Sequence, residues 1–204
     1  MAAIEVDTVL VHYLRHKFHD ALESGRLELI EGDILKADLA RLGTRPVIAG
    51  NLPYYITSPI LEKTFALGKN WARAVFLVQA EVAQRIAAVP GTRDFGYLSV
   101  LAQTHSRAEM LFPVSRMAFR PPPKVDSAVV RLTPRDAAAD FNISDVPAFL
   151  KFAQHCFQHK RKTLRNNLAP MYGAEKIAGL TEARLRAEQL GVAELAALYR
   201  KICV

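Results

Sequence analysis

Two spacings of apolar residues alternate along the first half of the chain. Short apolar runs that predict buried strands lie at 2–7, 27–31, 46–50 and 74–78. Between them, apolar residues recur every three or four positions, as on one face of a helix, and predict helices at 8–22, 59–67 and 80–88. Strands that alternate with helices predict a parallel, doubly wound α/β sheet.

The pattern changes after residue 90. A helix is predicted at 98–104, and two further strand-like runs, 110–114 and 127–132, flank a proline-stiffened loop. Two such strands suit an antiparallel hairpin at the edge of the sheet. The segment 134–145 is rich in Ala and Asp and has no clear periodicity, whereas the pattern beyond it is helical to the end. We therefore predict a sheet domain at 1–133, a linker at 134–145 and a helical domain at 146–204.

The four residues Asn51-Leu52-Pro53-Tyr54 follow the predicted strand at 46–50. They lie at the carboxyl end of that strand, which is where open α/β sheets bind ligands. The Asn51 side-chain oxygen and the Pro53 carbonyl suit accepting the two hydrogens of an exocyclic amine, while the Tyr54 ring stacks on the base. An ordinary turn remains the alternative, because Asn tolerates turn geometry and Pro fixes φ.

Composition narrows the possible partners and sites. Half of the 204 residues are apolar, which is enough for a substantial core, and the net charge of +7 favours a polyanionic partner. The two cysteines are far apart and form no CxxC pair, which argues against a disulfide framework or a zinc site. The sequence has no apolar run of membrane-spanning length and no signal segment, so we expect a cytoplasmic protein with no membrane partner.

Histidines and cations form two further patterns. His12, His16 and His19 share a predicted helix face, but no acidic ligand stands at matching spacing, so we expect a solvated face and no metal. No Asp or Glu occurs between residues 146 and 174, and we expect the cations there to contact phosphate, with a merely solvated basic face as the alternative. The candidate RNA-binding cations are Arg120 and Lys124 on the proline loop, and Lys160, Arg161, Lys162 and Arg165 in the helical part.

Six separated segments together resemble the ribosomal RNA adenine dimethyltransferase family. They are Ile4–Asp7, Gly32–Leu35, Asn51–Tyr54, Phe95–Val100, Phe119–Val130 and Lys160–Asn167. The resemblance covers nearly the whole chain and implies a Rossmann-like class I methyltransferase sheet with a small all-helical C-terminal domain. It also implies methyl transfer from S-adenosylmethionine to N6 of two adjacent adenosines near the 3′ end of small-subunit rRNA, and a role in small-subunit biogenesis.

The resemblance assigns cofactor contacts to three residues. Glu5 matches the acidic residue that hydrogen-bonds the ribose hydroxyls of S-adenosylmethionine. Asp33 matches the acceptor for the cofactor's adenine amine, and Ile34 matches the side chain that packs on the adenine ring. Asn51 is a fourth residue, which the resemblance implies lies next to the cofactor as well as the substrate.

The resemblance also assigns the catalytic segment. Asn51, Leu52 and Pro53 match the segment that holds the target amine, and Tyr54 and Phe119 match the aromatic pair that sandwiches an adenine taken out of its stack. Methyl transfer from a sulfonium depends mostly on positioning, because the leaving group departs neutral. A site without a catalytic His or Lys fits this chemistry.

One part of the family pattern is absent from the sequence. Ahead of the equivalent of Ile4, the family has a strand and a glycine-rich loop, and only glycine lets the backbone approach the cofactor so closely. The missing strand is expected between the strands at 2–7 and 46–50. We therefore expect an N-terminally truncated, incomplete enzyme that binds S-adenosylmethionine poorly. The alternative is a non-catalytic rRNA-binding or ribosome-assembly module, and in both cases we expect a monomer that binds a small-subunit assembly intermediate.

Overall fold

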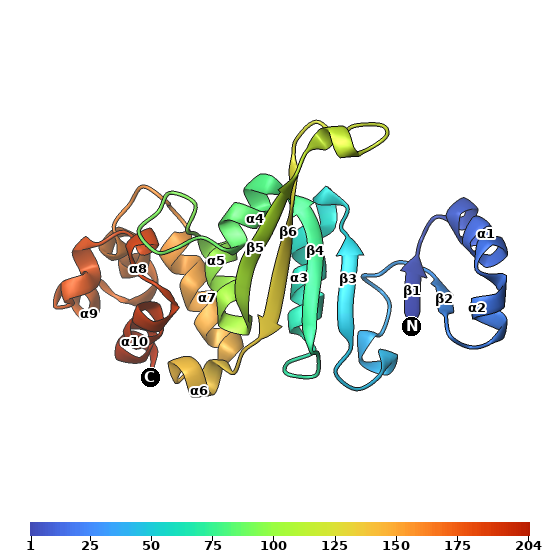
Figure 1. The fold of residues 1–204 in the computed structure, drawn as a ribbon. Coiled ribbons are helices and arrows are strands. Elements are labelled where there is room, and N and C mark those ends of the chain that lie inside the picture. Colours follow the sequence, from blue (N-terminus) through green and yellow to red (C-terminus); the bar gives the residue numbers. More distant parts are fainter.

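The computed structural model describes all 204 residues and has three parts along the chain (Figure 1). A two-stranded unit with two helices lies at one end, a four-stranded sheet lies in the middle, and a group of helices that contains the C-terminus lies at the other end. The mixed α/β class that the hydrophobic pattern predicts is confirmed.

The first unit pairs two parallel strands. Its elements are β1 (Ala2–Glu5), α1 (Thr8–Lys17), α2 (His19–Glu23) and β2 (Glu28–Glu31). The helix predicted at 8–22 is interrupted at Phe18, which has non-helical backbone angles. Asp7 begins α1 as its N-cap, because its carboxylate accepts from the amides of Val9 and Leu10 at 2.8 and 3.2 Å. β1 thus ends directly before a fixed helix start.

The second sheet has the order β3-β4-β6-β5. Its strands are β3 (Val47–Asn51), β4 (Arg73–Gln79), β5 (Ser106–Val114) and β6 (Ser127–Pro134). β3 and β4 are parallel, whereas β6 runs antiparallel to both β4 and β5, so the predicted edge hairpin is confirmed. The sheet is therefore mixed and not parallel throughout. β1 and β3 make no ladder with each other, and each forms the edge of its own sheet.

One face of the four-stranded sheet carries the first core. Alternate residues of the central strands, such as Phe76 and Val130, are fully buried against helices α3 (Thr57–Phe65), α4 (Ala80–Ile86) and α5 (Tyr97–His105), which lie behind the sheet in Figure 1. The helix predicted at 59–67 begins two residues earlier, because a 3-10 turn at Tyr54–Ile56 runs directly into it. The carboxyl end of β3 therefore leads through one short loop into a packed helix.

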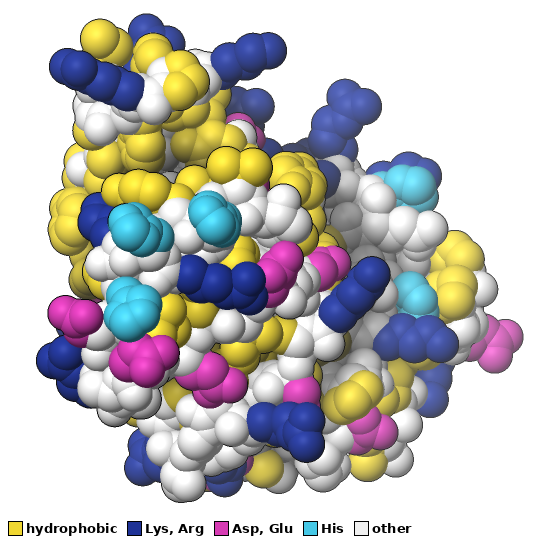
Figure 2. Space-filling model, turned by 90° about the vertical axis from the view of Figure 1, so that its right-hand side faces the viewer, with side chains coloured by type: hydrophobic (Ala, Val, Ile, Leu, Met, Phe, Trp, Pro, Cys, Tyr) yellow, Lys and Arg dark blue, Asp and Glu magenta, His cyan; other side chains and the backbone are white.

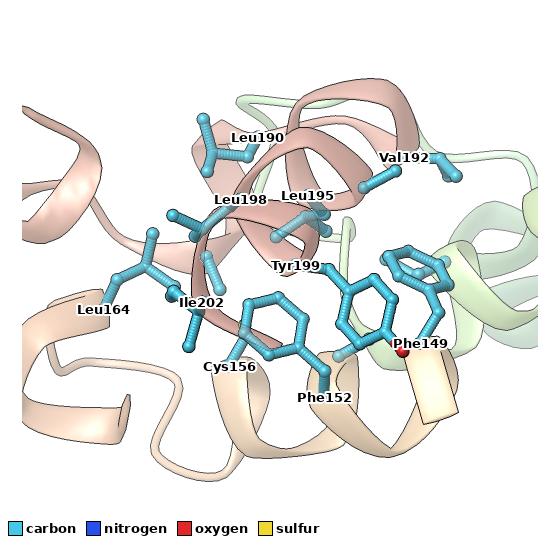
Figure 3. Packing of buried hydrophobic residues seen from close by; sticks show 14 of the residues in the cluster. Phe149, Phe152, Cys156, Leu164, Leu190, Val192, Leu195, Leu198, Tyr199 and Ile202 are labelled. Atoms are coloured by element: carbon cyan, nitrogen blue, oxygen red, sulfur yellow. The ribbon is translucent and has the colours of Figure 1, made fainter. Parts of the chain in front are cut away.

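The C-terminal helices form a second core. They are α6 (Ala137–Phe141), α7 (Val146–Phe157), α8 (Leu164–Tyr172), α9 (Ala174–Ala178) and α10 (Val192–Cys203). In Figure 3, aromatic side chains of α7 and α10 point toward one another, and the rings of Phe149 and Tyr199 meet edge to face at 5.8 Å. None of the helices has the length and apolar character that a bilayer crossing requires.

The segment 134–145, predicted as a linker, is folded onto the helical part. Ala137 and Ile143 are buried in the second core, and the Arg200 guanidinium donates to the Phe141 carbonyl at 2.8 Å. Phe95, from the sheet side of the predicted boundary, is buried in the same core. The division into a sheet domain and a helical domain stays a prediction, and the two parts share packed side chains.

Candidate active site

Leu52 anchors the loop after β3 to the sheet core. Its amide donates to the Leu77 carbonyl of β4 at 3.0 Å, and its side chain is only 6% exposed within the sheet core. Asn51 and Pro53, on either side, are exposed. The buried leucine thus fixes the loop, and its neighbours face solvent at the carboxyl end of the strand.

The loop forms one wall of a pocket of about 290 Å³. Two segments that are far apart in the sequence line it: Asn51, Leu52, Pro53 and Tyr54 from the β3 loop, and Phe119, Pro121 and Pro123 from the loop between β5 and β6. The Tyr54 and Phe119 rings are both half-buried, and no stacked or edge contact joins them. The structure therefore brings the predicted aromatic pair to one pocket without packing the two rings on each other.

The Tyr54 ring is held by Ser127, a residue to which the motifs assigned no role. Its hydroxyl lies 2.7 Å from the hydroxyl of Ser127, which is completely buried at the start of β6. Next to it, the Asp126 carboxylate accepts from the Arg116 amide at 2.9 Å and so ties down the proline loop. The sequence signal was the position of these residues directly after the proline loop, but the partner Tyr54 is 73 positions away.

The free hydrogen-bond acceptors differ from the expectation in one respect. The Pro53 carbonyl already accepts from the Ile56 amide at 3.1 Å and from the Thr57 hydroxyl at 3.4 Å, because the chain turns into the 3-10 segment there. The Asn51 side chain and the Leu52 carbonyl have no hydrogen-bond partner in the chain. The acceptors open to a ligand are therefore on Asn51 and Leu52, and the Pro53 carbonyl is occupied.

The predicted cofactor carboxylates both lie where the strands of the two-stranded sheet end. Glu5 Oε1 accepts from the amides of Val6 and Asp7 at 2.8 and 2.9 Å, which leaves Oε2 without a partner. The Gly32 amide donates to the Glu5 carbonyl at 2.8 Å, so Asp33 follows next to the end of β1. One acidic residue that ends β1 and one in the loop after β2 thus lie at the same end of the sheet.

The loop that carries Asp33 is attached to the main sheet. Asp33 Oδ1 accepts from the Leu35 amide at 2.8 Å, and Oδ2 has no partner. The Lys63 ammonium on α3 donates to the Leu35 carbonyl at 3.0 Å, and Ile34 packs against the sheet core. The loop that carries Asp33 is therefore tethered to the helix that follows the Asn51 loop.

The family model of ribosomal RNA adenine dimethylase matches residues 1–200. The chain belongs to this family. It is 42% identical to the ribosomal RNA small subunit methyltransferase A of Acidobacterium capsulatum, over 99% of the chain and 73% of that protein. The methyltransferase of the same name from Pseudomonas aeruginosa is 41% identical over 98% of the chain and 74% of that protein. The resemblance found in the motifs is confirmed.

Solved structures agree on the fold. A dimethyladenosine transferase from Plasmodium falciparum superposes with a TM-score of 0.82 at 22% identity, over 98% of the chain and 82% of that protein. The 23S rRNA methyltransferase ErmE gives a TM-score of 0.66 at 23% identity, over 98% of the chain and 81% of that protein. These likenesses support the Rossmann-like methyltransferase fold of this family member.

The candidate RNA-binding cations of this dimethylase lie in two places, and all are exposed. Arg120 and Lys124 belong to the proline loop, Lys160, Arg161 and Lys162 to the turn between α7 and α8, and Arg165 to the first turn of α8. None of the six makes an ion pair. The Lys160 ammonium instead donates to the Arg93 carbonyl at 2.6 Å, and buried Asn167 donates to the Cys156 carbonyl at 2.7 Å. These bonds hold the basic turn in place.

His12, His16 and His19 lie on α1 and α2, and no group of three or more potential metal ligands is present.

Proposed function

We propose that the pocket between Tyr54 and Phe119 holds an adenine of small-subunit rRNA with its N6 amine on Asn51 and Leu52. The observation that carries this proposal is the pair of unoccupied acceptors, Asn51 Oδ1 and the Leu52 carbonyl, at the edge of a pocket with two unstacked aromatic rings. As a member of its family, the chain is an S-adenosylmethionine-dependent rRNA adenine dimethyltransferase.

The residues at the β1–β2 edge fit the donor groups of S-adenosylmethionine. Glu5 Oε2 and Asp33 Oδ2 are free acceptors for ribose hydroxyls and an adenine amine, and Ile34 is an apolar neighbour for the adenine ring. The bound cofactor supplies an electrophilic methyl group on a sulfonium. We propose that Glu5, Asp33 and Ile34 hold its adenosine part.

The pocket residues work by positioning. Two acceptors that take both amine hydrogens turn the nitrogen lone pair away from Asn51 and Leu52, toward an incoming methyl group. Methyl transfer would form a nitrogen–carbon bond as the cofactor's sulfur–carbon bond breaks, and the nitrogen held by Asn51 and Leu52 would release one proton to solvent. No strong base is required, because the sulfonium leaves as a neutral thioether. The gain comes from orientation.

The proposed substrate is two adjacent adenosines near the 3′ end of the small-subunit rRNA, within an assembly intermediate. The relatives named ribosomal RNA small subunit methyltransferase A support this choice. The exposed cations of the proline loop and of the α7–α8 turn are suited to the flanking phosphates. An extruded base, held between aromatic rings, is how enzymes reach a base that is otherwise stacked.

The test is labelled methyl transfer from S-adenosylmethionine to small subunits that lack the dimethylated adenosines. At an S-adenosylmethionine concentration high enough to offset the poor cofactor binding expected from the sequence, the wild-type chain should transfer label. Asn51→Ala should lower the rate by about a hundredfold, since misplacement of a reacting group has that order of effect. Affinity for the subunit should stay within about threefold, because phosphate contacts supply most of it. Asn70→Ala is the matched control, because Asn70 is exposed in the segment between α3 and β4 and does not line the pocket.

Two results would contradict the proposal. Subunit binding by the wild-type chain without any label transfer would support the non-catalytic assembly module. Equal loss of affinity and rate in Asn51→Ala would show that this residue maintains the structure of the loop.

A further inference from the structure

The tip of the β5–β6 hairpin is an exposed apolar surface. It rises above the rest of the molecule in Figure 1, and Figure 2 shows apolar side chains at this tip with Lys and Arg side chains around them. Met117 is 75% exposed and Phe112 is 53% exposed. Apolar side chains gathered on a projection are typical of a contact surface.

Met117 is presented by a fixed turn. It lies in a 3-10 turn at Arg116–Ala118, and its amide donates to the Ser115 hydroxyl at 3.2 Å. The Arg116 amide is bound to the Asp126 carboxylate, and the Arg116 guanidinium reaches the Lys124 carbonyl at 3.4 Å across the loop. The backbone is therefore tied on both sides of an outward-pointing methionine.

The charge around this tip indicates a nucleic acid. Arg116, Arg120 and Lys124 are exposed and have no carboxylate partner, and no Asp or Glu occurs between residues 110 and 125. Of the two acids that flank this segment, Glu109 pairs with Arg131, and the Asp126 carboxylate accepts from the Arg116 amide. An apolar point surrounded by unpaired cations suits a stack of bases between phosphates.

We propose that Met117 is a wedge that packs against the bases next to the adenine in the pocket and fills the space that the extruded adenine leaves in its stack. This inference rests on the proposed function. Phe119 lies two residues further along the same tied loop and lines the pocket. In this proposal, the loop presents Phe119 to the extruded adenine and Met117 to the stack of bases that the adenine has left. Methionine is one of the apolar residues that proteins insert between base steps.

The test compares Met117→Ala and Met117→Leu with the wild-type chain in single-turnover methyl transfer to the unmethylated small subunits. Met117→Ala should transfer about tenfold more slowly, because unstacking the adenine is no longer compensated, and its subunit affinity should stay within about twofold. Met117→Leu should retain most of the rate. Met171→Ala is the matched control, since Met171 is also exposed, at 55%, but lies on α8.

A second measurement does not depend on transfer. The probe is an RNA hairpin with two adjacent adenosines and with the fluorescent base 2-aminopurine next to the target adenosine. Binding of the wild-type chain should change the 2-aminopurine fluorescence by at least about twofold, because Met117 replaces the adenine on which this base was stacked. Met117→Ala should lose most of this change, and Met171→Ala should keep it.

The outcomes separate the wedge from the proposed function. Wild-type transfer that Met117→Ala leaves unchanged overturns the wedge alone. A fluorescence change that requires Met117, without transfer by the wild-type chain, supports the wedge and overturns the function. Rate and affinity that fall together in Met117→Ala would make the tip a docking contact, for example with a ribosomal protein, and would also overturn the wedge.

Discussion

A hydroxyl–hydroxyl bond decides where the Tyr54 ring lies. Tyr54 follows β3, and Ser127 opens β6, so the 2.7 Å bond between them joins the two loops that enclose the pocket. A phenol held at one end leaves its ring face available to a base. Ser127 is thus a positioning residue, which acts on the substrate only through Tyr54.

Removing either hydroxyl should have the same effect on methyl transfer. We expect Ser127→Ala and Tyr54→Phe each to slow single-turnover transfer by about tenfold, a loss of the order of one hydrogen bond. The double variant should be no slower than either single variant, because both changes remove one interaction. Rates that multiply in the double variant would show that the two residues act independently.

Helix α5 is fixed to α3 through an unusual pair of rings. His105, the last residue of α5, stacks on Phe65, the last residue of α3, at 4.9 Å and an angle of 10°. Burial lowers the pKa of His105 below its ordinary value. The unfolded chain therefore binds a proton at this position more readily than the folded chain does.

This pair predicts a dependence of stability on pH. The pKa of the His105 imidazole is lower in the folded chain than in the unfolded chain, where it is near 6.5. The stability that the neutral imidazole contributes is therefore fully present above pH 6.5 and is lost as the pH falls below that value. Between about pH 7.5 and pH 5.5, the wild-type chain should lose more free energy of unfolding than His105→Phe, as measured by urea denaturation. His16→Phe, changed on an exposed part of α1, should behave like the wild type. Equal losses in all three chains would contradict this assignment.

Among the cations of the whole molecule, exposed ones lie beside the pocket, in the proline loop, and in the basic turn between α7 and α8. The net charge of +7 does not by itself say where RNA binds. In the folded chain, Lys160 is occupied by the Arg93 carbonyl, whereas Arg161 and Lys162 next to it have no partner. These two cations are the free charges of the turn between α7 and α8.

Removing Arg161 and Lys162 should weaken the binding of any RNA to a similar extent, whatever the RNA sequence. The variant with Arg161→Ala and Lys162→Ala should bind the rRNA more weakly and reduce the slope of log affinity against log salt by about one to two, as expected for two lost phosphate contacts. The control changes Lys17 and Arg26 to Ala, two exposed cations of the two-stranded unit. An unchanged slope in a salt titration would mean that this turn faces solvent in the complex.

Much of the fold and part of the site could be predicted from local patterns. The alternation of buried residues in β4, the helices after it and the edge hairpin were all readable, because each depends on neighbours a few positions apart. The position of Asn51 at the end of a strand was readable for the same reason. The folded structure of segment 134–145 was not readable. Its weak periodicity hides two residues, Ala137 and Ile143, that are buried by distant helices.

The sequence by itself determined the strands, the helices and the identity of the chemical groups: an amide after a strand, two carboxylates, two aromatic rings and a basic segment. Only the tertiary structure decided which of these groups meet. The insertion of β6 between β4 and β5 brings Ser127 to Tyr54 and the proline loop to the Asn51 loop, and the 3-10 turn occupies the Pro53 carbonyl while Leu52 stays free. Local periodicity records which face of an element is buried, but contacts between positions many tens of residues apart depend on how the elements pack together.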